Sequence, residues 1–214
     1  MNIIIFGPPG AGKGTQSKFI VNKFKLFQVS TGDLLRKEIK DNSDLGRKIS
    51  QIIKSGDLVS DLIVSNLIER IISKKDYENR MIFDGYPRNL SQAKNLSNLL
   101  QKYNQKIDLV IRLVVRQETI EKRITGRLTC KNCNKIYNIF FNPPPQENEC
   151  CSKDNLKKRE DDNVKTLINR YKSYEKETIP LMDYYKNLNL LRDLDGEREI
   201  SEIYKEISDL INLI

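Results

Sequence analysis

The chain has 214 residues, of which 38% are hydrophobic, and a formal net charge of +8 from 37 Lys and Arg against 29 Asp and Glu. This length suits one compact domain with room for an inserted subdomain, and the absence of histidine excludes catalysis by imidazole. No apolar run approaches the ~18 residues that span a bilayer, and a strand pattern begins at the N-terminus, so we expect neither a membrane span nor a signal peptide. The expected compartment is the cytoplasm, where disulfides are disfavoured.

A glycine-rich loop at residues 7–15, GPPGAGKGT, is the motif around which the chain is organised. It follows the unbroken apolar run of residues 3–6, which is typical of a strand buried on both faces of a parallel sheet. Apolar residues recur at helical spacing behind it. The backbone N–H groups of such a loop and the helix N-terminus bind phosphate, and Lys13 adds a mobile charge for the outer phosphates. The alternative, a glycine-rich turn without a ligand, does not explain why strand, spacing, lysine and helix agree.

Further strand patterns alternate with helical patterns along the chain, which predicts a parallel α/β sheet. The strand patterns lie at residues 26–29, 81–83, 109–115 and from 190 onward. The helical patterns run from a cap at Thr31 to residue 39, from Ser43 or Asp44 to a stop at Gly56, from Ser60 to residue 72, from 91 to 100, from 117 to 126, from 159 to an interruption at Pro180, and from 200 to 211. The short helices before residue 81 exceed what one crossover needs, so we expect a small helical flap there.

Asp84 directly follows the strand pattern at residues 81–83. A carboxylate at the C-terminal end of a parallel strand lies near the phosphate loop of a doubly wound sheet. We therefore expect Asp84 and Thr15 to hold Mg²⁺ through water molecules. A structural aspartate in a turn is the alternative.

The alternation of strands and helices fails between Arg127 and Arg159. This segment contains all four cysteines and three consecutive prolines at residues 143–145, and it has too few apolar side chains for a core of its own. The prolines oppose regular strand pairing. A module this short needs a covalent or metal staple.

Several of these motifs, taken together and in order, resemble the adenylate kinase family. They lie at residues 7–15, 30–35, 83–88 with Gln92, 126–127, and 159–163 with Arg170, so the resemblance covers essentially the whole chain. It implies a P-loop fold in which a five-stranded parallel sheet is flanked by helices. It also implies a core of residues 1–29, 60–126 and 160–214, a helical AMP-binding flap at 30–59 and an inserted lid at 127–159.

The resemblance implies the reversible, Mg²⁺-dependent transfer of the γ-phosphoryl group of ATP to AMP, which gives two ADP and serves adenine nucleotide homeostasis. A monomer that binds neither nucleic acid nor membranes is expected. Phosphoryl transfer needs positioning and charge neutralisation more than a chemical base. A chain without histidine but with arginines at the ends of its elements fits that demand, although each arginine taken singly could form a surface salt bridge.

The resemblance also assigns site residues. The ATP-binding set is Gly10, Ala11, Gly12, Lys13, Gly14, Thr15, Arg123, Arg127, Ile136, Tyr137 and Arg198. The AMP-binding set is Thr31, Arg36, Asp57, Leu58, Val59, Gly85, Tyr86, Pro87, Arg88, Gln92, Arg159 and Arg170. The catalytic set, in which the two aspartates would position the lid and its arginines, is Lys13, Arg88, Arg127, Arg159, Asp161, Asp162 and Arg170.

The cysteines have the spacing of metal ligands. Cys130 and Cys133 form one metal-binding knuckle. In the zinc-bearing form of the family a second pair of ligands follows, and Cys150 and Cys151 compete here for the first position of that pair. With Cys150, a lysine stands in the fourth position and cannot bind metal. With Cys151, Asp154 follows at the required spacing, and zinc accepts three thiolates and one carboxylate. We expect one structural Zn²⁺ with the register open; metal-free thiols are the alternative, and a disulfide is least favoured in the cytoplasm.

Two rival functions use the same residues differently. Another nucleoside monophosphate kinase would share the scaffold, but Gln92 favours adenine in the acceptor pocket because an amide both donates and accepts hydrogen bonds. A zinc-ribbon nucleic-acid-binding protein with a vestigial nucleotide site would explain the net charge of +8 and the cysteine knuckle. Against it, the arginines lie in a phosphate-loop context rather than along one basic stripe.

Overall fold

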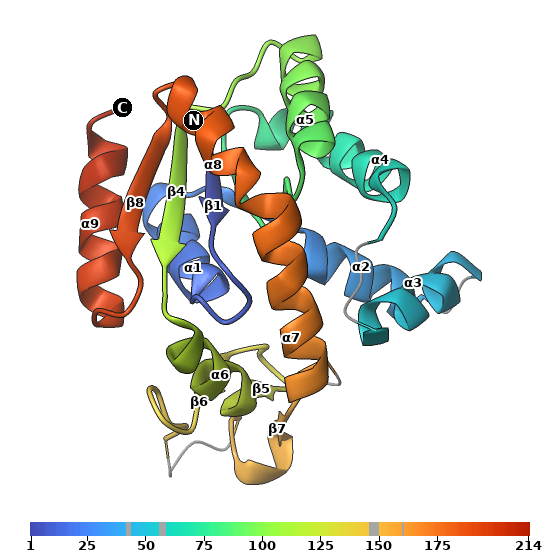
Figure 1. Cartoon of the computed structure of the whole chain (residues 1–214), viewed down its shortest axis with the longest axis vertical. Coiled ribbons are helices and arrows are strands. Elements are labelled where there is room, and N and C mark those ends of the chain that lie inside the picture. Colours follow the sequence, from blue (N-terminus) through green and yellow to red (C-terminus); the bar gives the residue numbers. More distant parts are fainter. Residues whose placement is uncertain (42–43, 56–58, 146–149, 160) are drawn as a thin grey trace.

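A computed structural model describes residues 1–41, 44–55, 59–145, 150–159 and 161–214. Its centre is a five-stranded sheet (Figure 1) in the order β2 (Phe27–Ser30), β3 (Met81–Asp84), β1 (Asn2–Phe6), β4 (Leu109–Val114) and β8 (Leu191–Asp195). All pairings of neighbouring strands in this sheet are parallel. The predicted five-stranded parallel sheet is therefore confirmed, and each strand begins within one residue of its predicted start.

Alternate side chains of the central strand enter two hydrophobic cores, one on each face of the sheet. Ile3 and Ile5 of β1 belong to one core, whereas Ile4 and Phe6 belong to the other, because successive side chains of a strand point to opposite faces. All four are at most 2% exposed. The unbroken apolar run of β1 is thus explained by cores on both faces.

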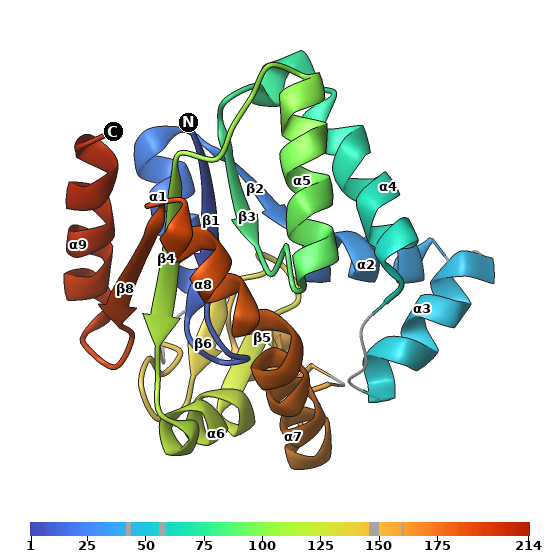
Figure 2. The same ribbon diagram turned by 45° about the horizontal axis from the view of Figure 1, so that its top comes forward.

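Helices complete both cores. The core that contains Ile3 receives side chains from α1 (Lys13–Phe24), α6 (Gln117–Thr125) and α9 (Ile200–Asn212). The core that contains Ile4 receives side chains from α4 (Asp61–Ile72), α5 (Leu90–Lys102) and α8 (Pro180–Asn187). Figures 1 and 2 show α9 beside β8 at one edge of the molecule, with α4 and α5 on the other side of the sheet. Within the described ranges, the helices are all too short or too polar to cross a membrane.

Two further helices, α2 (Thr31–Lys40) and α3 (Asp44–Ser55), follow β2 along the chain. They are followed by α4 and the short 3₁₀ turn η1 (Lys75–Tyr77), after which β3 begins. The extra helices expected in this crossover are therefore present, and α3 projects away from the sheet in Figure 1. The predicted boundaries at Ser43 and Gly56 lie outside the described residues.

The predicted helix cap at Thr31 is wrong by one residue. Ser30 is the N-cap of α2, and its Oγ accepts a hydrogen bond from the backbone N–H of Asp33 at 3.3 Å. The hydroxyl of Thr31 donates instead to the carbonyl oxygen of Gly85 at 2.8 Å. The local pattern predicted that Thr31 caps the helix, but its hydroxyl bonds a distant backbone carbonyl instead.

The segment that interrupts the alternation forms a second, smaller sheet. Its antiparallel strands lie in the order β6 (Ile136–Asn138), β5 (Arg127–Cys130) and β7 (Leu156–Lys157), and β7 follows the 3₁₀ turn η2 (Lys153–Asn155). In Figure 1 this sheet lies at the bottom of the molecule, below α6 and α7 (Val164–Ser173). The sequence patterns did not predict strands here, because each is only two to four residues long.

The long helix after the small sheet changes its winding before Pro180, where an interruption was predicted. Helix α7 passes into a π-helix at Tyr174–Thr178, and Pro180 opens α8, at a position where its missing N–H does no harm. The hydroxyl of Thr178 donates to the carbonyl oxygen of Arg88 at 2.8 Å. The π-helix therefore contacts the loop that follows β3.

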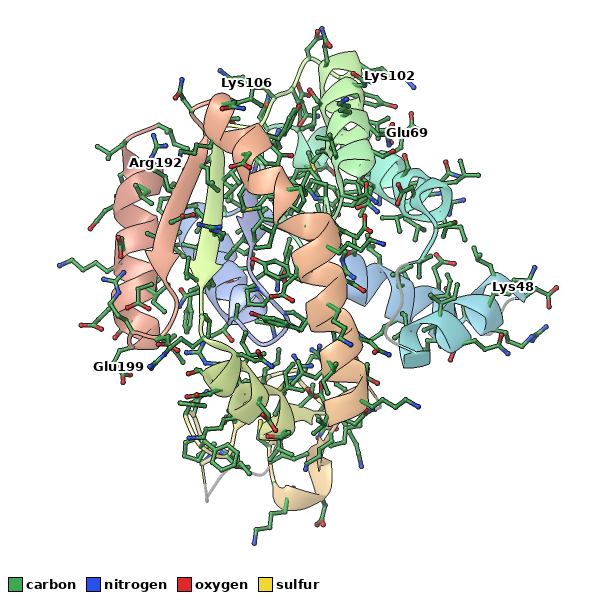
Figure 3. All side chains as sticks on the ribbon, viewed as in Figure 1. Lys48, Glu69, Lys102, Lys106, Arg192 and Glu199 are labelled. Carbon is green, nitrogen blue, oxygen red and sulfur yellow. The ribbon has the colours of Figure 1, made fainter. Side chains whose placement is uncertain are left out.

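Charged side chains project from separate parts of the surface (Figure 3). Among the side chains labelled there, Lys48 lies on α3, Lys106 precedes β4 and Arg192 lies on β8, while Lys102 pairs with Glu69 at 2.8 Å. Lysines scattered in this way are typical of a solvated surface.

Candidate active site

The glycine-rich loop connects the C-terminal end of β1 to the N-terminus of α1. Gly10 and Gly12 have φ values of +83° and +97°, which glycine adopts without steric strain. A Cβ atom at Gly10 would lie 3.1 Å from Cγ1 of Ile124 and 3.2 Å from the carbonyl oxygen of Ile120, so the loop packs closely on α6. This path directs the loop backbone to a helix N-terminus, where N–H groups favour an anion.

Lys13 is the first residue of α1, and its side chain folds back over the loop. Its Nζ donates to the carbonyl oxygens of Gly7 at 2.8 Å and Pro8 at 3.0 Å. Burial lowers the pKa of Lys13 to about 8, against the opposing attraction of Asp84. Arginines also lower this pKa by repulsion, which indicates that several cations gather around one amine.

Asp84 ends β3 and faces the first turn of α1, as predicted from its place at the end of a strand. Its Oδ2 accepts a hydrogen bond from Nε2 of Gln28 at 3.0 Å, and a Cβ atom at Gly14 would lie 3.5 Å from the same oxygen. Burial raises the pKa of Asp84, while Lys13 opposes the rise. Thr15 lies in the same turn of α1, so the two residues expected to hold magnesium lie at one end of the sheet.

Arginines from separate elements surround Lys13. Burial lowers the pKa of Lys13 most and Asp84 opposes this, while repulsion from Arg170, Arg88 and Arg127 lowers the pKa further. Burial, followed by repulsion from Arg170, lowers the pKa of Arg88 to about 10. Burial, followed by repulsion from Arg127 and Arg36, lowers the pKa of Arg159 to about 10. A buried group of like charges is stabilised by a bound anion, which makes this place a candidate site for phosphate.

Two aspartates hold arginines next to the small sheet. Arg127 pairs with Asp162, with Nε to Oδ2 at 2.8 Å, and the Asp162 side chain is fully buried. Arg170 of α7 pairs with Asp161, with Nη1 to Oδ2 at 2.8 Å. These ion pairs orient the two guanidinium groups.

A pocket lies beside these cations, between the loop after β3 and helices α2 and α4. Its lining residues are Thr31, Leu35, Val59, Val64, Gly85, Tyr86, Arg88 and Gln92. Leu35 and Val64 were not predicted, although their helical spacing could have placed them on an inward face. The remaining six belong to the AMP-binding set. Two members of that set, Asp57 and Leu58, lie outside the described residues.

The other members of the AMP-binding set lie around this pocket or near the cations. Arg36 pairs with Asp33 on the first turns of α2, Pro87 links Tyr86 to Arg88, and Arg159 and Arg170 belong to the cation group described above. Inside the pocket, Gln92 is 4% exposed. Its amide Oε1 accepts from the N–H of Arg88 at 2.8 Å, and its Nε2 donates to Oδ1 of Asp61 at 2.6 Å.

The ATP-binding set is only partly brought together. Arg123 of α6 donates to the carbonyl oxygens of Ala11 at 3.2 Å and Gly196 at 2.9 Å, so it links the phosphate loop to the turn after β8. Arg198 pairs with Glu206 of α9, and its side chain is 39% exposed. Among the described contacts, none joins Arg198 to the phosphate loop. Ile136 is half-buried on β6.

Tyr137 was expected near the ATP base or ribose, but its side chain lies in the core of the small sheet. It is 3% exposed and packs with Cys130 and Cys151, with Leu128 and Leu156 around them. In this structure the ring of Tyr137 therefore faces the cysteines.

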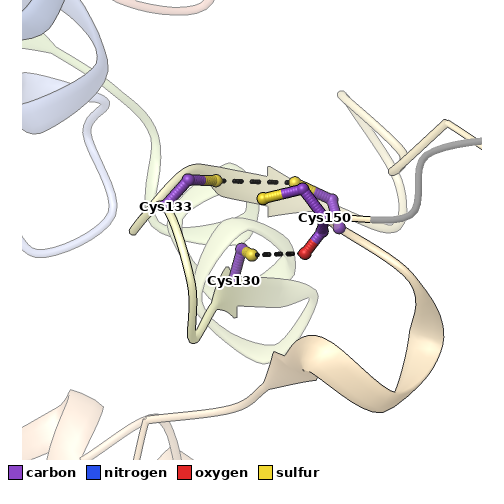
Figure 4. Close-up of side chains that lie close together, drawn as sticks. Cys130, Cys133 and Cys150 are labelled. Carbon is purple, nitrogen blue, oxygen red and sulfur yellow. Dashed lines mark hydrogen bonds between the residues drawn. The ribbon is translucent and has the colours of Figure 1, made fainter.

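All four cysteines form one cluster, and Figure 4 labels Cys130, Cys133 and Cys150 of it. Their Sγ atoms lie within 4.8 Å of one another, and those of Cys133 and Cys151 are 3.5 Å apart, well beyond a disulfide bond of about 2.05 Å. The Sγ of Cys130 also donates to the carbonyl oxygen of Cys150 at 3.1 Å. Zinc–sulfur bonds of about 2.3 Å imply sulfurs about 3.8 Å apart in a tetrahedral site, so these four thiols fit one zinc ion.

The structure corrects the expected competition between Cys150 and Cys151, because both belong to the cluster. The chain turns at these two residues, so their side chains need not point to opposite sides as they would in a strand. Asp154, the expected fourth ligand, is exposed and outside the cluster. Its backbone carbonyl accepts a hydrogen bond from Nζ of Lys131 at 3.0 Å.

Some residues that contact the site carried no signal in the sequence. Gln28 donates a hydrogen bond to Asp84, and Thr178 donates one to the carbonyl oxygen of Arg88. Asp61 accepts one from Gln92. Each comes from a different element than its partner. Only the tertiary structure reveals such contacts.

Comparison with known proteins agrees with this geometry. A family model described as adenylate kinase matches residues 5–190. A protein from Pelagibacter ubique named adenylate kinase is 46% identical over 213 residues, covering 100% of both chains. A protein of the same name from Archaeoglobus fulgidus is 41% identical over 216 residues, covering 100% of this chain and 99% of that one. The match spans nearly the whole chain and coincides with the phosphate loop, the cation group and the pocket, and the chain therefore belongs to the adenylate kinase family.

Proposed function

We propose that this phosphotransferase moves the γ-phosphoryl group of Mg²⁺-bound ATP to AMP, reversibly, giving two ADP in adenine nucleotide homeostasis. The observation that carries the proposal is the position of the Lys13 and arginine group beside the pocket lined by Thr31, Arg88 and Gln92. One phosphate chain at the loop and a second phosphate at the pocket would meet among these cations.

The phosphates of ATP would bind at the N-terminus of α1, through the backbone of Gly10 to Thr15 and the amine of Lys13. Lys13 now bonds two neutral carbonyl oxygens, and an ionised phosphate is a stronger partner. AMP would lie in the pocket with its phosphate at Arg88. Arg36, Arg159 and Arg170 would also neutralise that phosphate.

The transfer itself needs no general base from the protein. An oxygen of the AMP phosphate, already ionised, attacks the γ-phosphorus in line while the bond to the β–γ bridging oxygen breaks, and ADP leaves. Charge on the transferring group would be neutralised by Lys13, Arg88 and Arg127, which stand in place before the reaction. The ion pairs of Asp161 and Asp162 support this arrangement by restricting the guanidinium groups.

Asp84 and Thr15 are the residues that would hold magnesium through water molecules. The Mg²⁺ held there would supply positive charge that neutralises the phosphates. The hydrogen bond from Gln28 supports this role for Asp84, because it orients the carboxylate at the phosphate end of the sheet.

We divide the chain into a core of residues 1–29, 60–126 and 160–214, an AMP-binding flap at 30–59 and a lid at 127–159. Closing the flap and lid over both nucleotides would exclude water, which would otherwise accept the phosphoryl group. In the lid, Arg127 would meet the phosphates, while Arg123, Ile136, Tyr137 and the segment at Arg198 would lie near the rest of ATP. Because the ring of Tyr137 is buried, we place its contact with ATP at its backbone.

The lid cysteines would bind one structural Zn²⁺ that takes no part in the chemistry. Four thiolates fill a tetrahedral shell and leave no open position for substrate. We further propose a cytoplasmic monomer that binds neither nucleic acid nor membranes. The thiols of Cys133 and Cys151 lie 3.5 Å apart without a disulfide bond, which fits a reducing compartment. Among the described residues, the surface lysines are scattered rather than gathered in a stripe for nucleic acid.

A coupled assay with ATP and one of four acceptors, AMP, UMP, CMP or GMP, tests the substrate assignment. We expect AMP to be phosphorylated fastest. Faster turnover of UMP or CMP would show that the protein is a different nucleoside monophosphate kinase. A titration with single-stranded and duplex nucleic acid at physiological salt tests the remaining rival, and saturable binding there would contradict our proposal on partners.

A further inference from the structure

The amide of Gln92 is held from both ends. Its Oε1 accepts from the backbone N–H of Arg88 at 2.8 Å, and its Nε2 donates to Oδ1 of Asp61 at 2.6 Å. A backbone N–H can only donate and a carboxylate can only accept. If the amide rotated by 180°, both contacts would become unfavourable at once, so its orientation follows from the chemistry of its neighbours.

Asp61 is held in turn by Asn89. The Nδ2 of Asn89 lies 3.2 Å from both carboxylate oxygens of Asp61. The other end of that amide cannot exchange places with it, because Oδ1 of Asn89 accepts the backbone N–H of Gln92 at 2.8 Å as the N-cap of α5. Asp61, the first residue of α4, is therefore required as an acceptor on two sides, and the four residues form one network in which each hydrogen bond has a single direction.

Gln92 also lines the acceptor pocket while only 4% exposed. An amide has two N–H donors and two acceptor lone pairs. The two side-chain bonds described above use one of each, which leaves one donor on Nε2 and one lone pair on Oε1. The edge of adenine presents an acceptor, N1, next to a donor, the 6-amino group. Hypoxanthine presents the reverse, a donor N1–H next to the acceptor O6.

We propose that Asp61 is a specificity-determining residue that acts through Gln92. By fixing the amide orientation, it makes the acceptor site select a 6-aminopurine nucleoside monophosphate over a 6-oxopurine one. An amide free to rotate would match either edge equally well, whereas a fixed amide meets hypoxanthine with donor against donor and acceptor against acceptor. This inference rests on the proposed function, since it concerns the base of the acceptor.

The unsubstituted protein provides the first test, with ATP and three acceptors: AMP, purine riboside 5′-monophosphate and inosine 5′-monophosphate. The purine riboside keeps the N1 acceptor and lacks only the 6-amino group. We expect kcat/KM to fall in that order, with inosine monophosphate at least about 10²-fold below AMP because buried polar groups are mismatched. Inosine monophosphate equal to or better than the purine riboside would show that the amide rotates freely, and would overturn the inference.

The second test compares Asp61→Asn with Asp183→Asn. Asp183 is an exposed residue in the first turn of α8, so it matches the charge change and helix position without lining the pocket. Asn at position 61 removes the negative charge and replaces one carboxylate oxygen with an NH₂ donor, so Asn89 loses one of its two oxygen partners and the acceptor that faces Gln92 is no longer fixed. We expect the AMP to inosine monophosphate ratio of kcat/KM to fall at least about tenfold in Asp61→Asn, with KM for AMP raised more than kcat is lowered. Asp183→Asn should retain the ratio.

The outcomes separate the inference from the function on which it rests. If the unsubstituted protein phosphorylates AMP and Asp61→Asn lowers both acceptors equally, Asp61 has only a structural role and the inference is wrong. If Asp61→Asn does not fold, the order of the three acceptors in the unsubstituted protein still decides. If that protein does not phosphorylate AMP at all, the proposed function itself is wrong.

Discussion

The five-stranded sheet and the small sheet at residues 127–157 bury different kinds of side chain. In the first, β1 alone places Ile3, Ile4 and Ile5 in cores on both faces, each at most 1% exposed. In the second, the buried residues are Cys130, Tyr137 and Cys151, with Leu128 and Leu156 packed against them. The large sheet can be stable through burial of apolar area alone. The small sheet has less such area, so we expect its stability to depend on a metal held by its four cysteines.

The groups that would act on the phosphates and the groups that would stabilise the lid also lie at different sheets. The cations that would neutralise phosphate charge gather around Lys13 at the end of the large sheet. Of these, only Arg127 lies on the small sheet, and Asp162 holds it there. A change at Lys13 should therefore alter reaction rate and spare the lid, whereas a change at the cysteines should alter the lid and spare the chemistry.

Lys13→Met should give the largest effect, a fall in turnover of about 10³-fold or more, because a charge that stabilises the transferring group is lost. The melting temperature should not fall. The pKa of Lys13 is lowered to about 8, so its charged form opposes folding below pH 8, and this penalty disappears only as the pH rises through 8 towards the unfolded pKa. Lys48→Met, at an exposed position on α3, is the matched control. Near-normal turnover in Lys13→Met would remove the loop from the mechanism.

Removal of metal should affect the small sheet far more than the large one. Metal binding energy becomes folding energy where no sufficient core exists. After chelation we expect hydrogen exchange at the amides of β5 and β6 to accelerate by at least about 10²-fold, and exchange at β1 and β4 to change little. Much of the activity should persist at low temperature. Equal acceleration in both sheets, or none in either, would contradict the comparison.

The ligand set can be resolved by single substitutions. We expect Ser at any of the four cysteines to weaken metal binding at least about tenfold, measured by competition with a chromophoric chelator, because each supplies a thiolate. Asp154→Ala should leave metal content at about one zinc per chain, since Asp154 is outside the cluster. If Cys150→Ser were silent and Asp154→Ala released the metal, the site would be three thiolates and one carboxylate.

The smallest expected effect is a pH dependence of ATP affinity, which depends on Lys13 at the large sheet and not on the small sheet. In the nucleotide-free protein the pKa of Lys13 is about 8, and a bound phosphate favours the protonated amine. The affinity for ATP should therefore fall as the pH rises through about 8, by up to about tenfold. Isothermal titration calorimetry between pH 7 and 9.5 measures this, and the same profile is expected after chelation. A similar slope in Lys13→Met would assign the titration to another group.

The sequence alone was sufficient for the large sheet, because its signals are local. The apolar run of residues 3–6, the glycines and Lys13 act within one strand–loop–helix unit, and Asp84 is placed by the rule that parallel strands end at one edge. Thr31 shows the limit of local patterns. Its hydroxyl could cap a helix, but the carbonyl of Gly85, 54 residues away in the chain, binds it instead.

Only the tertiary structure revealed that Cys150 and Cys151 join one cluster, that the ring of Tyr137 is buried, and how the Gln92 amide is oriented. Spacing rules treat Cys150 and Cys151 as alternatives, yet a turn brings both sulfurs within 4.8 Å of the others. The family resemblance assigned Tyr137 to the ATP-binding set, but its ring is buried among those cysteines. Gln92 is oriented by Asp61, 31 residues away. In each case the decisive partner lies on another element, and hydrogen-bond direction and packing depend on distances in space, which residue spacing along the chain does not encode.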